Sequence, residues 1–330
     1  MNNNNFLHKN SFENLKILIV GDIILDHYLI GKVDRISPEA PVPVVLHEVE
    51  DYRLGGAANV ALNIKSMGGS PVLVSLVGAD YYGNKLTDLL IKEQIPTSNI
   101  FKDPHRKTTC KTRILARNQH LIRYDHESLH FINETLENKI FNSIKKIITG
   151  EDIDVIILQD YNKGLLTNNL IDSILLYARQ NNISTLADPK KSNFLAYKGV
   201  DYFKPNLREI NEGLQLAISE TDPDVSSLYN ASKQINEHLK NYCTLITLGP
   251  KGMYYHLSDQ KGIIPTNERQ IADVCGAGDT VISIIALGVA AKMNISDIIK
   301  LANIAGGQVC EKVGVVSVEK SKLLEEYNAQ

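Results

Sequence analysis

The sequence has few cysteines and no long apolar run. Its four cysteines lie far apart, at Cys110, Cys243, Cys275 and Cys310. The absence of any C-x-x-C pair argues against a zinc site and against the disulfide framework of a small secreted domain, so we expect free thiols and a cytoplasmic location. The longest apolar run, residues 281–291, is shorter than the roughly 20 residues that cross a bilayer, and the Asn-rich start lacks the apolar core of a signal peptide. We therefore expect no membrane association.

The sequence also has little net charge. Its 35 Lys and Arg residues against 38 Asp and Glu give a formal charge of −3, which argues against a general nucleic-acid binder that neutralises many phosphates. With 330 residues, 22% of them charged and 43% hydrophobic, the chain is in the range of ordinary globular proteins. We expect one large α/β domain or two smaller ones, with small molecules as partners.

Short apolar runs alternate with stretches of helical spacing. Residues 16–20 form a continuous apolar run that ends in Gly21-Asp22, the pattern of a strand buried on both faces. Similar runs occur at 72–77, 153–158, 184–187 and 244–248, and helical spacing occurs at 57–67, 133–148, 168–180, 225–239 and 276–291. This alternation predicts a three-layer α/β/α domain with a mainly parallel central sheet.

Two stretches break this alternation. Residues 32–54 are extended and contain several prolines, while residues 108–125 alternate so that Lys111, Arg113, Leu115 and Arg117 share one face. We expect one domain over residues 1–330, with an inserted β-sheet lid whose strands lie at about 32–54 and 107–126. A sheet this small needs another surface to cover its apolar face, so we also expect a homodimer through the lid.

A Gly-rich helix start is the strongest local motif. In the segment D-V-C-G-A-G-D-T at 273–280, Gly276, Ala277 and Gly278 come directly before the apolar helix. Backbone N–H groups at a helix start can bind an anion, and Asp279 beside them can accept a proton from an attacking hydroxyl. The alternative is that Asp279 only caps the helix. Val281 breaks the dinucleotide motif G-x-G-x-x-G, and no G-x-x-x-x-G-K-[ST] occurs, so a Rossmann dehydrogenase and a P-loop kinase are disfavoured.

A second Gly-containing helix start lies at 54–61. Gly55 and Gly56 allow the backbone to approach a ligand, and Asn59 offers a donor and an acceptor to sugar hydroxyls. The alternative is a helix that packs tightly on a strand.

Taken in order, these segments resemble those of the ribokinase-like (PfkB-type) carbohydrate kinases. The series is Asp26, G-G-A-A-N at 55–59, Asn206-x-x-Glu209, Thr247-Leu-Gly249 and G-A-G-D at 276–279. The resemblance implies an ATP-dependent kinase in which Asp26 binds substrate hydroxyls and Asp279 is the catalytic base. It also implies that Asn206 and Glu209 hold Mg²⁺ through water, which suits a metal that dehydrates reluctantly. Taken alone, N-x-x-E is typical of a solvated helix face.

The same resemblance also implies which residues contact the nucleotide and where a monovalent cation could bind. The candidate nucleotide contacts are Asn206, Thr247, Gly249, Gly252, Asn303 and Gly306, although the last two also suit helix packing. In many relatives a cation such as K⁺ binds beside the residue that corresponds to Asp273. Cys275 stands where relatives commonly carry Ser or Thr, so K⁺ dependence stays open.

Three further segments resemble those of bacterial heptose 7-phosphate kinases of lipopolysaccharide-core precursor synthesis. They are 34–44 (D-R-I-S-P-E-A-P-V-P-V), 117–125 and D-Y-N-K-G at 160–164. The resemblance implies transfer of phosphate to the anomeric hydroxyl of a heptose 7-phosphate, in a form that carries the kinase alone. The alternatives are a kinase of fructose 6-phosphate, ribose or another sugar, and a silent sugar-binding protein with the same fold.

A sugar phosphate needs basic residues for its distal phosphate. Arg113 and Arg123 are the leading candidates because a guanidinium donates two charge-assisted hydrogen bonds to phosphate, and Lys190 follows a predicted strand of the main sheet. Lys111 and Arg117 share the predicted face of Arg113. The alternative is that these arginines pair with acidic neighbours, such as Asp125 and Glu127, on a solvated surface.

Overall fold

Two β-sheets organise the structure, a computed structural model that describes residues 11–116 and 119–329. Within these residues the large sheet has nine strands in the order β13-β12-β11-β10-β9-β8-β1-β4-β5. All neighbours pair in parallel except β11 with β12 and β12 with β13. The predicted mainly parallel sheet is confirmed.

Each apolar run that the sequence indicates overlaps a strand of the large sheet. The strands are β1 (Lys16–Gly21), β4 (Ser70–Gly78), β5 (Ile100–Asp103), β8 (Val155–Gln159), β9 (Ser184–Asp188), β10 (Tyr202–Phe203), β11 (Cys243–Thr247), β12 (Met253–Leu257) and β13 (Gln260–Ile264). Because β4 and β8 lie on opposite sides of β1, the chain changes direction across the sheet there. Ligands of parallel α/β sheets bind at such a switch point, outside the carboxyl ends of the strands.

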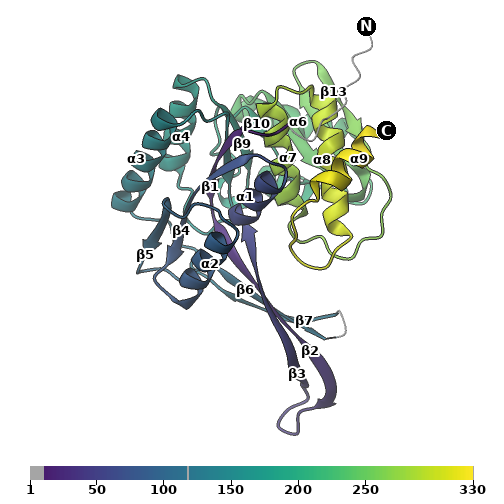
Figure 1. The fold of residues 1–330 in the computed structure, drawn as a ribbon. Helices are drawn as coiled ribbons and strands as arrows, with labels where there is room; N and C mark the ends of the chain where they lie inside the picture. Colours follow the sequence, from purple (N-terminus) through teal and green to yellow (C-terminus); the bar gives the residue numbers. More distant parts are fainter. Residues whose placement is uncertain (1–10, 117–118, 330) are drawn as a thin grey trace.

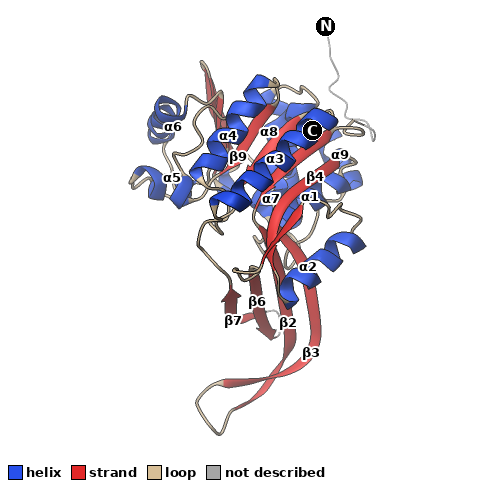
Figure 2. Cartoon of the chain, turned by 90° about the vertical axis from the view of Figure 1, so that its left-hand side faces the viewer, coloured by secondary structure: helices blue, strands red, loops and turns tan. Residues whose placement is uncertain are grey.

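Helices cover both faces of this sheet (Figures 1 and 2). They are α1 (Ala57–Ser66), α2 (Tyr81–Lys92), α3 (Glu134–Gly150), α4 (Asn168–Gln180), α5 (Leu207–Leu214), α6 (Val225–Leu239), α7 (Ala277–Ala290), α8 (Ile295–Cys310) and α9 (Lys320–Asn328). The apolar sides of α1, α7 and α8 pack in one core, and those of α3, α4 and α6 in the other. None of the helices in the described residues is long and apolar enough to cross a membrane.

Strand β1 shows why the sequence folds into three layers. Ile17 and Ile19 point into the core with α1, α7 and α8, whereas Leu18 and Val20 point into the other core. All four side chains are fully buried. A strand buried on both faces has no position for a polar side chain, so its residues form a continuous apolar run.

The second sheet is smaller and extends away from the main body (Figure 1). Its strands, in the order β3-β2-β6-β7, are β2 (Ile23–Ile36), β3 (Pro43–Gly56), β6 (Cys110–Ala116) and β7 (Gln119–His126). We call it the small sheet. Strand β2 already begins at Ile23, directly after β1, whereas the sequence indicated a start near residue 32.

Strand β6 pairs with β2 in continuous register from Cys110 to Ala116. Lys111, Arg113 and Leu115 therefore alternate as predicted, and the irregular register between β6 and β7 lies on β7, where Leu121 is the extra residue between the partners of Ile114 and Leu115. Arg117 lies outside the described residues.

Candidate active site

The carboxylate of Asp279 lies in the first turn of α7 and is 2% exposed. It accepts hydrogen bonds from Asn59 Nδ2 at 3.0 Å, from Gln159 Nε2 at 3.1 Å and from the Tyr161 hydroxyl at 2.5 Å. The N-cap of the helix is Gly276, without a side-chain cap. Asp279 is therefore not a capping residue; three side chains from other segments hold its carboxylate.

The pKa of Asp279 is suited to proton transfer. Burial, together with the charges of Asp188 and Asp26, raises this pKa to about 6, against the opposing effect of the donors Tyr161 and Asn59. The carboxyl group is thus mostly ionised at neutral pH. It can accept a proton, and its basicity exceeds that of an ordinary aspartate.

Backbone N–H groups surround the start of α7. Gly276 has a φ of 79°, and a Cβ there would lie 2.8 Å from Asn59 Nδ2, so only glycine fits this turn. The N–H groups of Gly276 and Gly278 have no partner among the described residues, whereas Ala277 N–H donates to Val274 O at 3.3 Å. Two of the three predicted anion-hole donors are therefore free, and the third is engaged in a long hydrogen bond.

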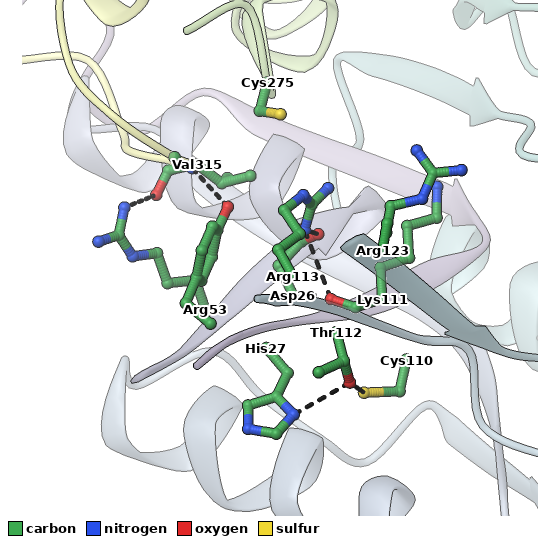
Figure 3. Close-up of polar contacts among 12 residues, drawn as sticks. Asp26, His27, Arg53, Cys110, Lys111, Thr112, Arg113, Arg123, Cys275 and Val315 are labelled. Carbon is green, nitrogen blue, oxygen red and sulfur yellow. Dashed lines mark hydrogen bonds and ion pairs between the residues drawn. The ribbon is translucent and has the colours of Figure 1, made fainter. Parts of the chain in front are cut away.

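The side chain of Asp26 projects from β2 and forms a buried ion pair with Arg113 of β6. Figure 3 shows both residues, with Lys111 and Arg123, on one face of the small sheet; His27, Thr112 and Cys110 lie on the other. Gly55 is required beside this pair, because a Cβ there would lie 2.0 Å from Asp26 Oδ2. Arg113 thus forms an ion pair with Asp26, the residue predicted to bind the sugar.

Gly56 and Asn59 of the 54–61 segment also contribute to the site. Gly56 has a φ of 60° and precedes α1. Asn59 is fully buried; its amide donates to Asp279, and its Oδ1 accepts a hydrogen bond from Asn63 Nδ2 at 3.1 Å. In this structure the amide of Asn59 contacts Asp279, and its contact with sugar hydroxyls stays a prediction.

Arg123 and Lys190 each have an acidic partner. Arg123 pairs with Asp125 at 2.9 Å and is 58% exposed, which is the solvated pairing named above as the alternative. Lys190 pairs with Glu209, and its ammonium lies 5.4 Å from the centre of the Tyr161 ring. Lys190 is thus beside the predicted metal residue.

Asn206 and Glu209 form a capping box at the start of α5. Asn206 Oδ1 accepts from Glu209 N–H, and Glu209 Oε2 accepts from Asn206 N–H, both at 2.8 Å. Burial and the charge of Asp188 raise the pKa of Glu209, against the opposing charges of Lys190 and Lys204.

This cluster can hold Mg²⁺ if the metal keeps most of its water. Asp188 Oδ1 is buried and has no hydrogen-bond partner among the described residues, and its proximity raises the pKa of Glu209. A divalent cation near Asp188 and Glu209 would offset the negative charge that Asp188 places beside Glu209. Within residues 11–116 and 119–329, no group of three or more His, Cys, Asp or Glu side chains could hold a metal alone.

Asp273 connects two loops. Its Oδ1 accepts from Cys275 N–H at 3.0 Å and its Oδ2 from Gly314 N–H at 2.9 Å. Although burial raises its pKa, these backbone donors bring it below the ordinary value. Each carboxylate oxygen already has a donor, so carbonyl oxygens of these loops would have to supply most ligands of a monovalent cation.

A cavity of about 580 Å³ opens beside the start of α7. The six predicted nucleotide contacts all line it: Asn206, Thr247, Gly249, Gly252, Asn303 and Gly306. Ala277 and Gly278 also line it, so the cavity is continuous with the predicted anion hole. Its walls are mainly apolar, as expected of a pocket for a planar base.

Two of these residues also serve the packing of the wall. Asn303 Nδ2 donates to Ile264 O at 2.9 Å, and a Cβ on Gly306 would lie 2.9 Å from Val281 Cγ2. Asn303 therefore fixes the end of β13, and Gly306 allows α8 to pack closely on α7. Both residues therefore have the packing role named above as the alternative, and both also line the cavity.

Sequence reasoning missed the donors Gln159 and Tyr161 and the acid Asp188. Gln159 and Asp188 end strands β8 and β9, and Tyr161 follows two residues after β8. Polar residues directly after buried strands were the available signal, since parallel strands carry ligand sites at their carboxyl ends. The D-Y-N-K-G motif was noticed, but without a role for its tyrosine.

Comparisons with known proteins point to one family. A family model described as pfkB family carbohydrate kinase matches residues 14–322. The bifunctional protein HldE of Aliarcobacter butzleri is 40% identical over 309 residues, and that of Trichlorobacter lovleyi 37% over 311. Each match covers 94% of this chain but only 63% and 62% of these relatives, so the chain spans less than two thirds of their length.

Solved structures share the fold at low sequence identity. Phosphofructokinase-2 from Escherichia coli in complex with potassium has a TM-score of 0.78 and 17% identity, with 96% of this chain and 98% of that chain covered. Ribokinase from Arabidopsis thaliana complexed with ribose and ATP has a TM-score of 0.72 and 13% identity, with 96% and 99% covered. The predicted ribokinase-like fold is thereby confirmed.

Proposed function

Because this chain belongs to the pfkB family of carbohydrate kinases, which are ATP-dependent, we propose that its substrate is D-glycero-D-manno-heptose 7-phosphate. The γ-phosphoryl group of ATP goes to the anomeric C1 hydroxyl, and the product is the 1,7-bisphosphate. The reaction belongs to the synthesis of ADP-heptose for the lipopolysaccharide core. The identity of 40% to a protein named HldE, and the three segments that resemble heptose 7-phosphate kinases, support this choice.

The position of Asp279 is the observation that carries the proposal. Asp279 follows Gly276 and Gly278, whose N–H groups are free, at the start of α7; Ala277 and Gly278 line the cavity, and the charge of Asp26 contributes to the raised pKa of Asp279. In this arrangement Asp279 takes the proton of the attacking hydroxyl, and the N–H groups stabilise the charge on the transferred phosphoryl group. Asp26, held by Arg113, orients the sugar hydroxyls.

The remaining groups act on the phosphates of ATP. Glu209 and Asn206 would hold Mg²⁺ through water, and the bound metal would supply positive charge to the phosphates. Lys190, beside Glu209, adds a second positive charge at this end of the cavity. A monovalent cation beside Asp273 is a further proposal, and activity with and without K⁺ tests it.

We also propose that the chain forms one kinase domain in which the small sheet is a lid and a dimer interface. Large apolar side chains are exposed on the small sheet: Ile36, Leu46, Val49, Leu121, Ile122 and Tyr124. A second copy of the chain would cover them, because two such sheets can pack face to face. The four cysteines are free thiols, which supports a cytoplasmic location.

Product analysis tests the proposed function. The purified chain is incubated with ATP, Mg²⁺ and, separately, heptose 7-phosphate, fructose 6-phosphate and ribose, and the products are identified by mass spectrometry. A bisphosphate from heptose 7-phosphate, absent with Asp279→Asn, supports the proposal. Turnover of only fructose 6-phosphate or ribose would favour one of the alternative substrates. The absence of turnover with every sugar would contradict the proposed kinase activity.

A further inference from the structure

A loop at residues 313–315 is hydrogen-bonded to the small sheet. Arg53 of β3 donates through Nη1 to Val313 O at 2.9 Å and to Val315 O at 3.2 Å. The hydroxyl of Tyr28 on β2 accepts the N–H of Val315 at 3.2 Å, and Figure 3 shows Arg53 with Val315. Two strands of the small sheet therefore hold a segment that begins 260 residues after Arg53 in the chain.

Glycine at position 314 allows this close approach. Gly314 has a φ of 75°, and a Cβ there would lie 2.6 Å from Arg53 Nη1 and 3.0 Å from the Tyr28 hydroxyl oxygen. A larger residue would strain the backbone and push the loop away from the small sheet. The contact between the loop and the sheet therefore requires a glycine here.

The same loop supports the start of α7. Gly314 N–H donates to Asp273 Oδ2 at 2.9 Å, and Asp273 Oδ1 accepts from Cys275 N–H at 3.0 Å. A Cβ on Gly276 would lie 3.3 Å from Val315 Cγ1, so the Val315 side chain packs beside the first residue of the predicted anion hole. A displacement of the loop would therefore displace the backbone N–H groups of the anion hole as well.

Tyr28 and Arg53 also contact the predicted sugar site. The Tyr28 ring is 2% exposed, and its centre lies 4.9 Å from Arg53 Cζ and 5.3 Å from Arg113 Cζ. Arg113 forms the ion pair with Asp26, and Arg53 is in register with Asp26 on the neighbouring strand. Stacked guanidinium groups and a buried ring thus form a continuous contact between Asp26 and the 313–315 loop.

We propose that Arg53 and Tyr28 are positioning residues that couple sugar binding at Asp26 to the geometry of the anion hole. A sugar that binds Asp26 orders β2 and β3, and these strands hold the loop, and with it the start of α7, in the position for phosphoryl transfer. By reciprocity, a bound γ-phosphate tightens the binding of the sugar. The inference rests on the proposed function in assuming kinase chemistry at Asp279, but it holds for any sugar that Asp26 binds.

Substitutions of Arg53 and Tyr28 test this coupling. Arg53→Met removes the donors and keeps much of the apolar stem, Arg53→Lys keeps a charge that can donate to one carbonyl, and Tyr28→Phe removes the acceptor of Val315 N–H. The matched control is Arg179→Met, because Arg179 is an exposed arginine that also donates to a backbone carbonyl, that of Gly199 at 3.3 Å. It ends α4 just before β9, whereas the candidate site lies at the carboxyl ends of the strands.

Three kinds of measurement are made on each variant. Steady-state assays give kcat and KM for the sugar and for ATP. Calorimetric titrations give Kd for ADP and for the non-hydrolysable ATP analogue AMP-PNP, without the sugar and with a saturating concentration of it. The melting temperature shows whether each variant is folded.

We expect Arg53→Met to lower kcat by about 10- to 100-fold, since a misplaced donor costs about this much in transition-state stabilisation. Kd for ADP stays within about twofold, because other residues line the cavity for the base. AMP-PNP binds more weakly relative to ADP, and the sugar tightens its binding less than in the unsubstituted protein. Arg53→Lys recovers part of kcat, Tyr28→Phe shows a smaller effect of the same kind, and Arg179→Met matches the unsubstituted protein.

Other results would overturn the inference. A raised KM for the sugar with an unchanged kcat would show that Arg53 contacts the sugar directly. Equal weakening of ADP and AMP-PNP, or no change in these affinities and in kcat, would show that the anion hole keeps its geometry without Arg53. If Arg53→Met does not fold, the same comparison is made with Arg53→Lys and Tyr28→Phe.

A failure of the proposed function is distinguishable from a failure of this coupling. If another sugar is turned over in place of heptose 7-phosphate, the proposed substrate is wrong, and the same constants measured with that sugar decide on Arg53. If no sugar is turned over, the affinities for ADP and AMP-PNP still decide. A selective loss for AMP-PNP in Arg53→Met supports the positioning role, and an equal response to both nucleotides overturns it.

Discussion

At the scale of single residues, the proposed base Asp279 accepts hydrogen bonds from side chains of two separate segments, the start of α1 and the end of β8 with the turn after it. Replacement by asparagine keeps the size of the side chain and removes its basicity. We expect Asp279→Asn to keep the fold and ATP binding and to lose about 10²- to 10⁴-fold in kcat, the usual contribution of general-base catalysis. Turnover assays and calorimetric titration with ATP check this. Turnover close to that of the unsubstituted enzyme in a folded variant would remove Asp279 from the role.

Tyr161 sets the basicity of Asp279 through the 2.5 Å hydrogen bond from its hydroxyl. This bond stabilises the carboxylate and lowers its pKa, against burial, which raises it to about 6. Activity requires the ionised form, so kcat/KM falls as the pH drops through about 6. In Tyr161→Phe the pKa rises, and the fall begins at higher pH.

The control for this pH profile is Tyr242→Phe, because Tyr242 is 55% exposed and distant in sequence from the site. Its profile should overlay that of the unsubstituted enzyme. If Tyr161→Phe loses activity equally at every pH, then Tyr161 has only a structural role, and the account of the base is wrong.

At the scale of elements, the turn after β8 shows how the D-Y-N-K-G motif works. Asp22, directly after β1, accepts the N–H groups of Tyr161 at 2.9 Å and Lys163 at 3.0 Å through one carboxylate oxygen. Gly164 closes the turn with a φ of 89°, and a Cβ there would lie 2.0 Å from His130 O. The turn thus directs Tyr161 to the base.

Gly164→Ala is therefore expected to destabilise the protein by about 1 to 3 kcal/mol, because the backbone is left-handed and the space is filled. Gly150→Ala at the end of α3 is the matched control, since no atom lies within 4 Å of its added Cβ. Urea unfolding measures both variants. Equal stability of Gly164→Ala and the control would show that the turn can rearrange at little cost.

The elements differ in how far the sequence alone predicts them. Buried strands such as β1 and amphipathic helices such as α4 follow from local patterns, because both faces of the strand and one side of the helix are apolar. The start of β2 at Ile23 and the extra residue Leu121 in β7 depend on pairing between strands. No local pattern encodes such pairing, so these features were not predicted.

The residues of the candidate site also differ in how far the sequence alone predicts them. Asp279 and the glycines before it form one continuous motif, so the sequence predicted them as a group. Gln159 and Tyr161 approach Asp279 only through the order of strands in the sheet. The partner of Arg113 was also unpredictable, because Asp26 is 87 residues away in the chain.

At the scale of the whole molecule, the exposed apolar surface of the small sheet predicts a dimer. Ile122 lies opposite Ile114, which lies opposite Leu29, so three apolar side chains form a row across three strands. Ile122 itself is 59% exposed. We expect a dimer at micromolar concentration by light scattering, and a monomer for Ile122→Asp, because a buried unpaired carboxylate is costly. A monomeric unsubstituted protein would contradict the interface.

The central claim is that this kinase acts on a heptose that already carries a phosphate. A competition experiment tests it most directly: equimolar heptose 7-phosphate, fructose 6-phosphate and ribose share one reaction with limiting ATP. The ratio of the products gives the ratio of the kcat/KM values. The account predicts heptose 1,7-bisphosphate as the main product by at least about tenfold, a difference of about 1.4 kcal/mol in transition-state binding. A majority of fructose bisphosphate or ribose phosphate would contradict it.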